Sequence, residues 1–234
     1  MIPPEKYQDL SPAEAIAYQH ELRKKIQISE LKNDITLIGG ADISFNKYED
    51  TVYAGIIVLS YPELQPVASV TIKSATKFPY LSGLLAFREI PALLIAWDKL
   101  QIKPDLMVLD GQGIAHRRRV GIATHFGLLT DVPSIGSAKS VLAGRFEMPD
   151  NKKFASSFMY DGAEEIGVAL ISKVNCKPIY ISPGHKININ QSLEIIKNCV
   201  GRYRIPEPTR LAHILVNQAR TGADPNGSGQ QSLF

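Results

Sequence analysis

Cysteine is scarce in the 234-residue sequence, and long apolar runs are missing. The two cysteines, Cys176 and Cys199, are far apart and lack the paired spacing of a zinc site, so a reduced pair is favoured over a disulfide. No run approaches the ~20 apolar residues that cross a bilayer, and the N-terminal segment MIPPEKYQDL lacks the apolar core of a signal peptide. We therefore expect a cytoplasmic protein without membrane attachment.

The glycine motifs of nucleotide-binding proteins are also missing. In the segment DGQGIAHRRRVG, residues 110–121, His116 stands where a Rossmann fingerprint requires its third glycine, and no Walker motif occurs. Charge of one sign is not in large excess: the net charge of +3 permits a nucleic-acid partner without requiring one. With 44% hydrophobic and 21% charged residues, the composition is that of an ordinary folded protein.

The order of the expected elements indicates an α/β protein with a ribonuclease H-like mixed sheet flanked by helices. Ser11 and Glu14 form a capping-box pattern around Pro12, which predicts an opening helix. Three strand-like runs with hairpin-length turns follow, and then helices alternate with strands, which is the order of that fold. Pro91 would kink the next helix or mark a turn in it. The expected strands are 35–45, 52–60, 67–73, 105–110, 132–140, 166–172 and 178–182, and the later helices are 84–100, 118–130, 190–200 and 207–220.

Three carboxylates are candidates for a metal site. Asp42 interrupts an apolar strand, where an unpaired charge would be costly, Asp110 ends a short strand, and Glu89 lies in the helix between them. In the expected sheet the two aspartates would project side by side with Glu89 approaching from the helix. Such a cluster repels itself unless a cation joins it, and Mg²⁺ suits oxygen ligands and phosphodiester hydrolysis. The plain alternatives are a turn-forming aspartate and a solvated helix charge at Glu89.

Four segments together resemble the endonuclease V family: GGADISF, FPYLSGLLAFREIP, DGQGIAHRRRVGIATHFG and IPEPTRLAH. The resemblance extends from about residue 11 to residue 220 and implies a Mg²⁺-dependent nuclease with a ribonuclease H-like fold, in which Mn²⁺ would substitute. It implies cleavage of the second phosphodiester bond 3′ to deoxyinosine or another deaminated base in double- or single-stranded DNA, leaving 3′-hydroxyl and 5′-phosphate ends. The implied metal ligands are Asp42, Glu89 and Asp110.

The resemblance also implies roles for basic residues. His213 matches the active-site histidine of the family, and Lys139 matches the lysine expected at the phosphate; from the residues alone, a structural histidine and a solvent-facing lysine are the alternatives. Arg117 and Arg118, with Arg119 beside them, supply charge for the phosphate backbone, unless they only form a solvated face. The candidate phosphate-binding residues are Arg88, Arg117, Arg118 and Lys139.

Lesion recognition requires a damaged base to leave the duplex and enter a pocket, where backbone groups can accept the oxygen of hypoxanthine and reject the amino group of adenine. Tyr80 resembles the strand-separating wedge of the family, although the same peptide also fits a turn with a buried tyrosine. The family often has proline where this chain has Ser82 and Arg117, so both loops lose fixed backbone angles. The implied wedge is Pro79, Tyr80, Leu81 and Ser82, and the implied base pocket is Gly83, Leu85, Gly111, Gly113 and His116.

We interpret residues 1–220 as a single endonuclease V-like catalytic domain and residues 221–234 as a flexible tail, because TGADPNGSGQQSLF offers little to bury. The ending QQSLF resembles the peptide by which bacterial repair proteins engage the sliding clamp, with Gln230, Leu233 and Phe234 as anchors. The alternative is a tail that is inert or packs locally.

Three other functions remain open at this point. The same machinery would serve an endonuclease whose substrate is inosine-containing RNA. An actin-like phosphotransferase would place acids similarly but predicts nucleotide-cradling glycine loops, which the sequence does not show convincingly. A non-catalytic nucleic-acid-binding module is disfavoured because the acids, Lys139 and His213 are all present.

Overall fold

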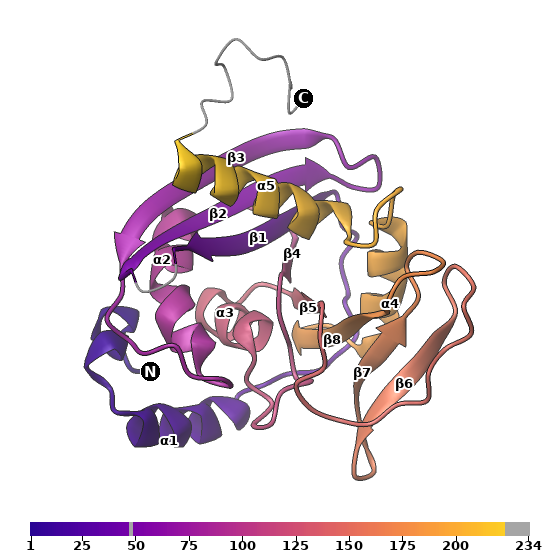
Figure 1. Ribbon diagram of the computed structural model, residues 1–234, viewed down its shortest axis with the longest axis horizontal. Coiled ribbons are helices and arrows are strands. Elements are labelled where there is room, and N and C mark those ends of the chain that lie inside the picture. Colours follow the sequence, from indigo (N-terminus) through magenta and orange to yellow (C-terminus); the bar gives the residue numbers. More distant parts are fainter. Residues whose placement is uncertain (47–48, 223–234) are drawn as a thin grey trace.

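The computed structural model describes residues 1–46 and 49–222, which form a mixed eight-stranded sheet flanked by helices (Figure 1). The order across the sheet is β3-β2-β1-β4-β5-β8-β7-β6. The strands are β1 Leu37–Phe45, β2 Thr51–Ser60, β3 Pro66–Ala75, β4 Leu106–Leu109, β5 Ser134–Ala138, β6 Ser156–Asp161, β7 Glu164–Leu170 and β8 Ile179–His185. The helices are the 3-10 helix η1 Pro4–Asp9 and the α-helices α1 Pro12–Arg23, α2 Leu85–Lys99, α3 Ile122–Thr130, α4 Ile189–Asn198 and α5 Glu207–Thr221.

The pairing of the first five strands matches the arrangement predicted from element order. β1, β2 and β3 are successive antiparallel neighbours, whereas β4 pairs in parallel with β1, and β5 in parallel with β4. The register places Ala41 opposite Leu109. Asp42, still within β1, and Asp110, directly after β4, each lie one residue further along and are therefore adjacent across these two parallel strands.

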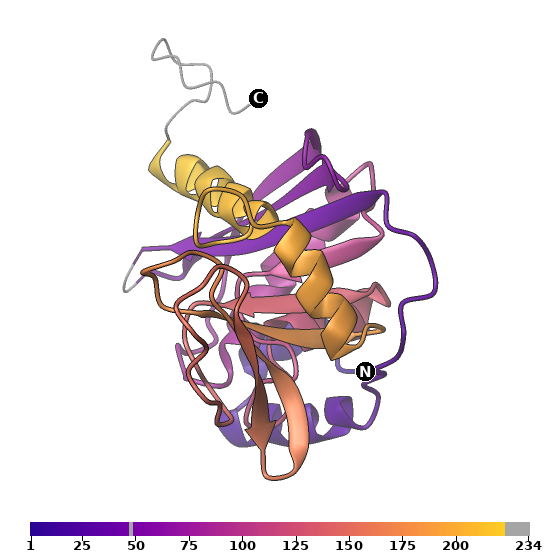
Figure 2. The same cartoon turned by 90° about the vertical axis from the view of Figure 1, so that its right-hand side faces the viewer.

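Helices cover both faces of the sheet and enclose two hydrophobic cores. η1, α1, α2 and α3 contribute to one core, which includes Tyr7, Phe87 and Phe126. α4 and α5 contribute to the other, with Ile38 of β1 and Ile196 of α4. α5 lies along β1 and β2, and the β2–β3 and β6–β7 hairpins occupy opposite ends of the sheet (Figure 2). The edge that carries the two aspartates is thus supported from both sides.

Most predicted elements are present, with ends shifted by a few residues. The capping box of α1 is formed: Glu14 N–H donates to Ser11 Oγ at 3.3 Å, and Ser11 N–H donates to the Glu14 carboxylate at 2.8 Å. α2 continues through Pro91 without a break. The predicted start of α3 near residue 118 was wrong, because Arg119 has a φ of 65°, which a right-handed helix does not accommodate.

Two further elements, η1 and β6, were not predicted. Among the described helices, none combines the length and apolarity needed to span a membrane. The proposed clamp-binding peptide, with Gln230, Leu233 and Phe234, lies outside the described residues, so that assignment stays a prediction.

Candidate active site

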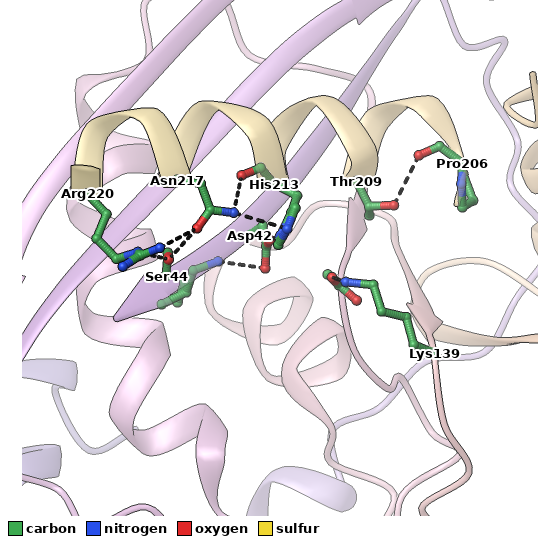
Figure 3. Close-up of polar contacts among 10 residues, drawn as sticks. Asp42, Ser44, Lys139, Pro206, Thr209, His213, Asn217 and Arg220 are labelled. Atoms are coloured by element: carbon green, nitrogen blue, oxygen red, sulfur yellow. Dashed lines mark hydrogen bonds and ion pairs between the residues drawn. The ribbon is translucent and has the colours of Figure 1, made fainter. Parts of the chain in front are cut away.

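β1, the end of β4 and α5 bring together three side chains of the kinds that can bind a metal ion. Asp42, Asp110 and His213 each offer one ligand atom, and these atoms all lie within 4.8 Å of one another. His213 Nδ1 lies 2.7 Å from Asp42 Oδ2, and the other oxygen of Asp42 accepts the Ile43 N–H at 2.8 Å (Figure 3). The two carboxylates are largely buried, while the His213 side chain is 53% exposed. His213 is therefore not the buried structural histidine that its apolar helix suggested.

A close contact between α5 and β1 sets the position of His213. A Cβ atom on Gly40 would lie 2.0 Å from the carbonyl oxygen of Pro208, so the first turn of α5 rests directly on the strand backbone. Within this turn, the Thr209 hydroxyl donates to the Pro206 carbonyl at 3.2 Å (Figure 3). His213 lies one helical turn beyond Thr209. Because Gly40 lets α5 rest on β1, the His213 side chain is placed next to Asp42.

Asn217 orients the imidazole, a contact that was not predicted from the sequence. Its amide oxygen accepts from Ser44 Oγ at 2.9 Å and from Arg220 Nη2 at 3.3 Å, so its NH₂ group faces His213. That group donates to His213 Nε2 at 3.0 Å and to the His213 carbonyl at 2.9 Å (Figure 3). Because Nε2 accepts, Nδ1 carries the proton and donates to Asp42. The i,i+4 spacing of His213 and Asn217 on one helix was the signal available in the sequence.

Glu89, on α2, is close enough to feel the charges of the two aspartates, but it is not among the three side chains whose ligand atoms lie within 4.8 Å of one another, so its role as a metal ligand stays a prediction. Burial, followed by the nearby charges of Asp42 and Asp110, raises the pKa of Glu89 to about 8. Burial and then Asp110 also raise the pKa of Asp42, against the opposing hydrogen bond from His213. The carboxylates thus repel one another in an environment that disfavours charge. Oxygen donors held this close fit a hard divalent cation, so the site can hold a metal ion.

Lys139 reaches the same cluster from the end of β5. Its Nζ forms an ion pair with Asp110 Oδ2, and its side chain is 43% exposed. Arg204 donates to the backbone carbonyl of Lys139 at 3.1 Å and holds this loop in place. A compact cation, half in solvent beside the carboxylates, is suitably placed to meet an incoming phosphate.

A cavity of about 400 Å³ opens beside the carboxylates, between the first turns of α2 and α3. It contains Gly83, Leu85, Gly111 and His116 of the predicted base pocket. The assignment of Gly113 to this pocket was wrong: a Cβ there would lie 2.2 Å from the Pro183 carbonyl, so Gly113 packs against β8 instead. The cavity is lined by Ser82, Gly83, Leu85, Ala86, Glu89, Asp110, Gly111, Gln112, His116, Val120, Gly121, Ile122, Ala138, Lys139, Ser140, Val141 and Leu142.

His116 is buried in the wall of this cavity and is neutral near pH 7. Burial and then the charge of Arg118 lower its pKa to about 4. Its Nδ1 accepts the Arg118 backbone N–H at 3.2 Å, so Nε2 carries the proton and donates to the Gly83 carbonyl at 3.0 Å. His116 therefore joins the loop of residues 110–121 to the loop that carries Tyr80.

The candidate wedge projects from the protein surface. Tyr80 is 63% exposed, and its ring centroid lies 5.8 Å from that of Phe45. Pro79 and Ser82 are exposed and Leu81 is half-buried. The alternative of a turn built around a buried tyrosine is therefore wrong.

Two of the arginines considered for phosphate binding are buried, and their guanidinium groups are already paired with other groups of the protein. Arg88, 8% exposed, donates to the Phe78 and Glu49 carbonyls, both at 2.8 Å, and so braces the segment before the wedge. Arg119, 6% exposed, pairs with Asp161 and Glu164 of the β6–β7 hairpin. Their burial corrects the expectation of phosphate contact.

The remaining basic candidates differ in accessibility. Arg117 is exposed, as is the Lys139 ammonium, whereas Arg118 is half-buried and bonded to Gln19 and Gly83. Of the predicted phosphate-binding set, Arg117 and Lys139 are therefore the two that can contact a DNA backbone. Lys139 would give up its ion pair with Asp110 to do so, whereas Arg118 would lose its hydrogen bonds to Gln19 and Gly83.

Comparisons with family models, curated proteins and solved structures all match this chain to the same family. Residues 20–214 match the family model described as Endonuclease V. The endonuclease V of Dictyoglomus turgidum is 45% identical over 201 residues, covering 86% of this chain and 87% of the relative. The crystal structure of an endonuclease V from Streptomyces avermitilis has a TM-score of 0.85 and 37% identity, covering 91% of this chain and 94% of that one.

A third similar protein is a Ciona intestinalis endonuclease V, whose structure is in complex with a 24mer DNA containing an inosine followed by a ribo-adenosine. Its TM-score is 0.78 and its identity 31%, with 91% of this chain and 98% of that chain covered. These likenesses confirm the predicted ribonuclease H-like fold. Because the family model matches most of the chain and these relatives are similar over nearly all of it, the chain belongs to the endonuclease V family of nucleases.

Proposed function

We propose that this chain is a Mg²⁺-dependent endonuclease that hydrolyses the second phosphodiester bond 3′ to deoxyinosine in DNA, leaving 3′-hydroxyl and 5′-phosphate ends. The observation that carries the proposal is the cluster of Asp42, Asp110 and His213 beside a cavity of about 400 Å³. The Ciona relative was bound to inosine-containing DNA, which supports the same substrate class here.

Two helix ends give the cavity a means to read a base. The first N–H groups of a helix have no partner within that helix, and the cavity is lined by the first residues of α2 and α3, Leu85 and Ile122. A backbone N–H aimed at the base accepts the oxygen of hypoxanthine and leaves the amino group of adenine unpaired. Tyr80, exposed next to the cavity, fills the gap that the extruded base leaves in the duplex.

The reaction requires charge stabilisation at phosphorus and an activated water. A divalent cation held by Asp42 and Asp110, with Glu89 beside them, would polarise the scissile phosphate and promote ionisation of water. Lys139 moves its ammonium from Asp110 to a non-bridging phosphate oxygen. His213, fixed by Asn217, holds Asp42 in one orientation through its Nδ1 proton. The oxygen of the activated water forms a new bond to phosphorus while the bond from phosphorus to the 3′ oxygen breaks; the proton released by the water goes to solvent, and the departing 3′ oxygen takes up a proton to become the 3′-hydroxyl.

Cleavage of an end-labelled duplex with one deoxyinosine tests the proposal. The native chain, Asp42→Ala and Glu63→Ala, an exposed acid in the β2–β3 turn, are compared with Mg²⁺ or with a chelator. We expect a Mg²⁺-dependent nick at the second bond 3′ to the lesion in the native chain and in Glu63→Ala, and none in Asp42→Ala. A folded native chain that leaves this duplex intact contradicts the proposal.

Inosine-containing RNA is the second candidate substrate. The observation in its favour is that the Ciona relative was bound to an inosine followed by a ribo-adenosine. Matched DNA and RNA oligonucleotides, each with one inosine, decide between the two by their relative kcat/KM. Binding of both without cleavage of either would leave only a nucleic-acid-binding role.

A further inference from the structure

Three side-chain donors converge on one backbone oxygen between the wedge and the cavity. The Gly83 carbonyl accepts from Arg118 Nη2 at 2.8 Å, from His116 Nε2 at 3.0 Å and from Gln19 Nε2 at 3.1 Å. We propose that Gln19 and Arg118 are positioning residues for lesion recognition, which fix the wedge loop, residues 79–83, relative to the base pocket. This inference rests on the proposed function and adds two residues to it.

Gln19 links three segments although it is remote from the reacting groups. It lies on α1 and is fully buried, and a buried amide is stable only when its polar atoms are paired. Its Nε2 donates to the carbonyls of Gly83 and Val120, both at 3.1 Å, and its Oε1 accepts from Arg118 Nε. One side chain thus joins the wedge loop, the loop of residues 110–121 and α1.

Arg118 uses its guanidinium fork in the same junction. Nε donates to Gln19, Nη2 donates to the Gly83 carbonyl, and its backbone N–H donates to His116. A single ammonium on a flexible stem cannot reproduce two directed bonds from one planar group. This geometry distinguishes Arg118 from its exposed neighbour Arg117.

Gly83 connects this junction to the wedge on one side and to the base pocket on the other. Its φ is 79°, and a Cβ there would lie 3.1 Å from Arg118 Nη2, so a side chain at this position would be strained and crowded. Gly83 lines the cavity and follows Tyr80 by three residues. A rotation of its peptide would move the wedge and the pocket wall together. Ser82 leaves the loop without a fixed φ, and the three hydrogen bonds to the next residue supply a constraint instead.

Two shape-conserving variants test the junction without DNA. Arg118→Lys keeps the charge and loses the fork, and Gln19→Met keeps the size and loses the amide; Arg23→Lys on α1 and Gln101→Met after α2 are matched exposed controls. We expect amide hydrogen exchange in residues 80–84 of the free protein to be about tenfold faster in both variants and unchanged in both controls. Native exchange rates in Arg118→Lys would overturn the proposal, even if Gln19→Met fails to fold.

Single-turnover cleavage of deoxyinosine DNA gives the second readout. We expect each variant to lose about tenfold to a hundredfold in rate, and the double variant to lose little more than one of them, since both act through Gly83. Affinity for undamaged DNA and its salt dependence should stay native in Arg118→Lys and Gln19→Met. In contrast, Arg117→Ala should weaken lesion and undamaged DNA alike and lower the salt slope by about one, with native exchange in the wedge loop.

The competing role for Arg118 is a phosphate contact, and the same experiment recognises it. A native cleavage rate in Arg118→Lys, with a reduced salt slope in Arg118→Ala, would assign Arg118 to the DNA backbone and reject the positioning role. If the native chain cuts no inosine substrate, the proposed function fails, while hydrogen exchange still decides whether Gln19 and Arg118 hold the wedge loop.

Discussion

At the residue scale, the active site depends on one hydrogen-bonded chain that fixes a histidine. Arg220 can only donate, so it turns the Asn217 oxygen toward itself and the Asn217 NH₂ toward His213. Ser44 strengthens this orientation by donating to the same oxygen. His213 is consequently held with its Nδ1 proton on Asp42, although more than half of its side chain is exposed. An exposed imidazole needs such support to keep one tautomer and one orientation.

Asn217→Ala should therefore impair catalysis more than binding. Loss of an outer hydrogen-bond partner of a site histidine typically reduces activity or metal affinity by about 10–100-fold. We expect a fall of that size in the single-turnover rate with KM nearly unchanged. Gln218→Ala, the next residue of α5, is the control and should cleave at the native rate. Equal rates for both variants would show that Asn217 does not orient His213 during the reaction.

Crowded carboxylates also predict a stabilising effect of cation binding. A ligand that binds only the folded state at 100-fold above its Kd adds about 2.7 kcal/mol to the free energy of unfolding. For a chain of this size, this corresponds to a rise in Tm of roughly 5–10 °C. We expect Mg²⁺ to raise Tm in the native chain and in Glu63→Gln, and to have little effect in Asp110→Asn. A full rise in Asp110→Asn would place the cation elsewhere.

At the element scale, the contact between α5 and β1 sets the geometry of the cluster of Asp42, Asp110 and His213. Gly40 lets the backbone of Pro208 approach so closely that any side chain there would displace the helix. His213 and Asp42 belong to the two elements that meet at this contact. A shift of α5 would therefore open the distance between the imidazole and the carboxylate.

Gly40→Ala should leave the protein folded but strongly reduce its cleavage rate. Forcing a methyl group against backbone costs about 1–3 kcal/mol of stability, which a domain of this size can tolerate, but a displacement near 1 Å can cost about a hundredfold in rate. Gly55→Ala is the graded control, because its Cβ would meet a methyl group of Val216, which can move more easily than backbone. Cleavage rates and denaturation midpoints should be measured for both. A native cleavage rate in folded Gly40→Ala would contradict this account.

The sequence was sufficient for elements with strong local patterns and for charges in unusual places. The capping box of α1 and the apolar strands follow from spacing alone, and Asp42 is conspicuous because it interrupts an apolar strand. The run from Arg117 to Arg119 was harder, because three identical residues in sequence differ in burial: Arg117 is exposed, Arg118 is half-buried and Arg119, with a positive φ, is buried. Only the tertiary structure separates an exposed arginine from one that pairs with the β6–β7 hairpin.

Other site features depended on long-range packing. Gln19 is an ordinary polar residue of α1 until that helix docks against the loops of Gly83 and Val120. Gly113 was assigned to the pocket because it belongs to the same DGQG segment as Gly111, but β8 occupies the space beside it. Neither contact has a local sequence signature.

At the scale of the whole molecule, stability depends on histidines buried in their neutral form. Burial lowers the pKa of His125 to about 3, and burial with Arg118 lowers that of His116 to about 4. His125 Nε2 lies 2.8 Å from the Tyr7 hydroxyl, so this ring joins η1 to α3 inside the first core. Protonation of either ring is possible mainly in the unfolded chain under mildly acidic conditions.

The two buried histidines should consequently lower the stability of the protein in mild acid, whereas Glu89, with its pKa raised to about 8, acts in the opposite direction. Below the unfolded histidine pKa of about 6.5, the unfolded chain binds protons on these two residues that the folded chain does not, so their contribution to stability falls as pH falls toward 4. The expected loss between pH 7.5 and pH 5 is roughly 1–2 kcal/mol for each of the two histidines. Denaturant titrations of the native chain and His125→Gln at both pH values measure it. An equal pH dependence in the two proteins would contradict the role of His125.

The contact of α5 with β1 also determines when the site is completed during translation. β1, with Asp42, and β4, followed by Asp110, leave the ribosome before α5, the last of the described elements, which brings His213 and Asn217. A nascent chain that ends before residue 207 has both aspartates but no histidine to hold them and no helix on Gly40. A growing polypeptide therefore lacks a complete hydrolytic centre until synthesis has passed nearly every other element, which separates the onset of nuclease activity from the period when the chain is still folding.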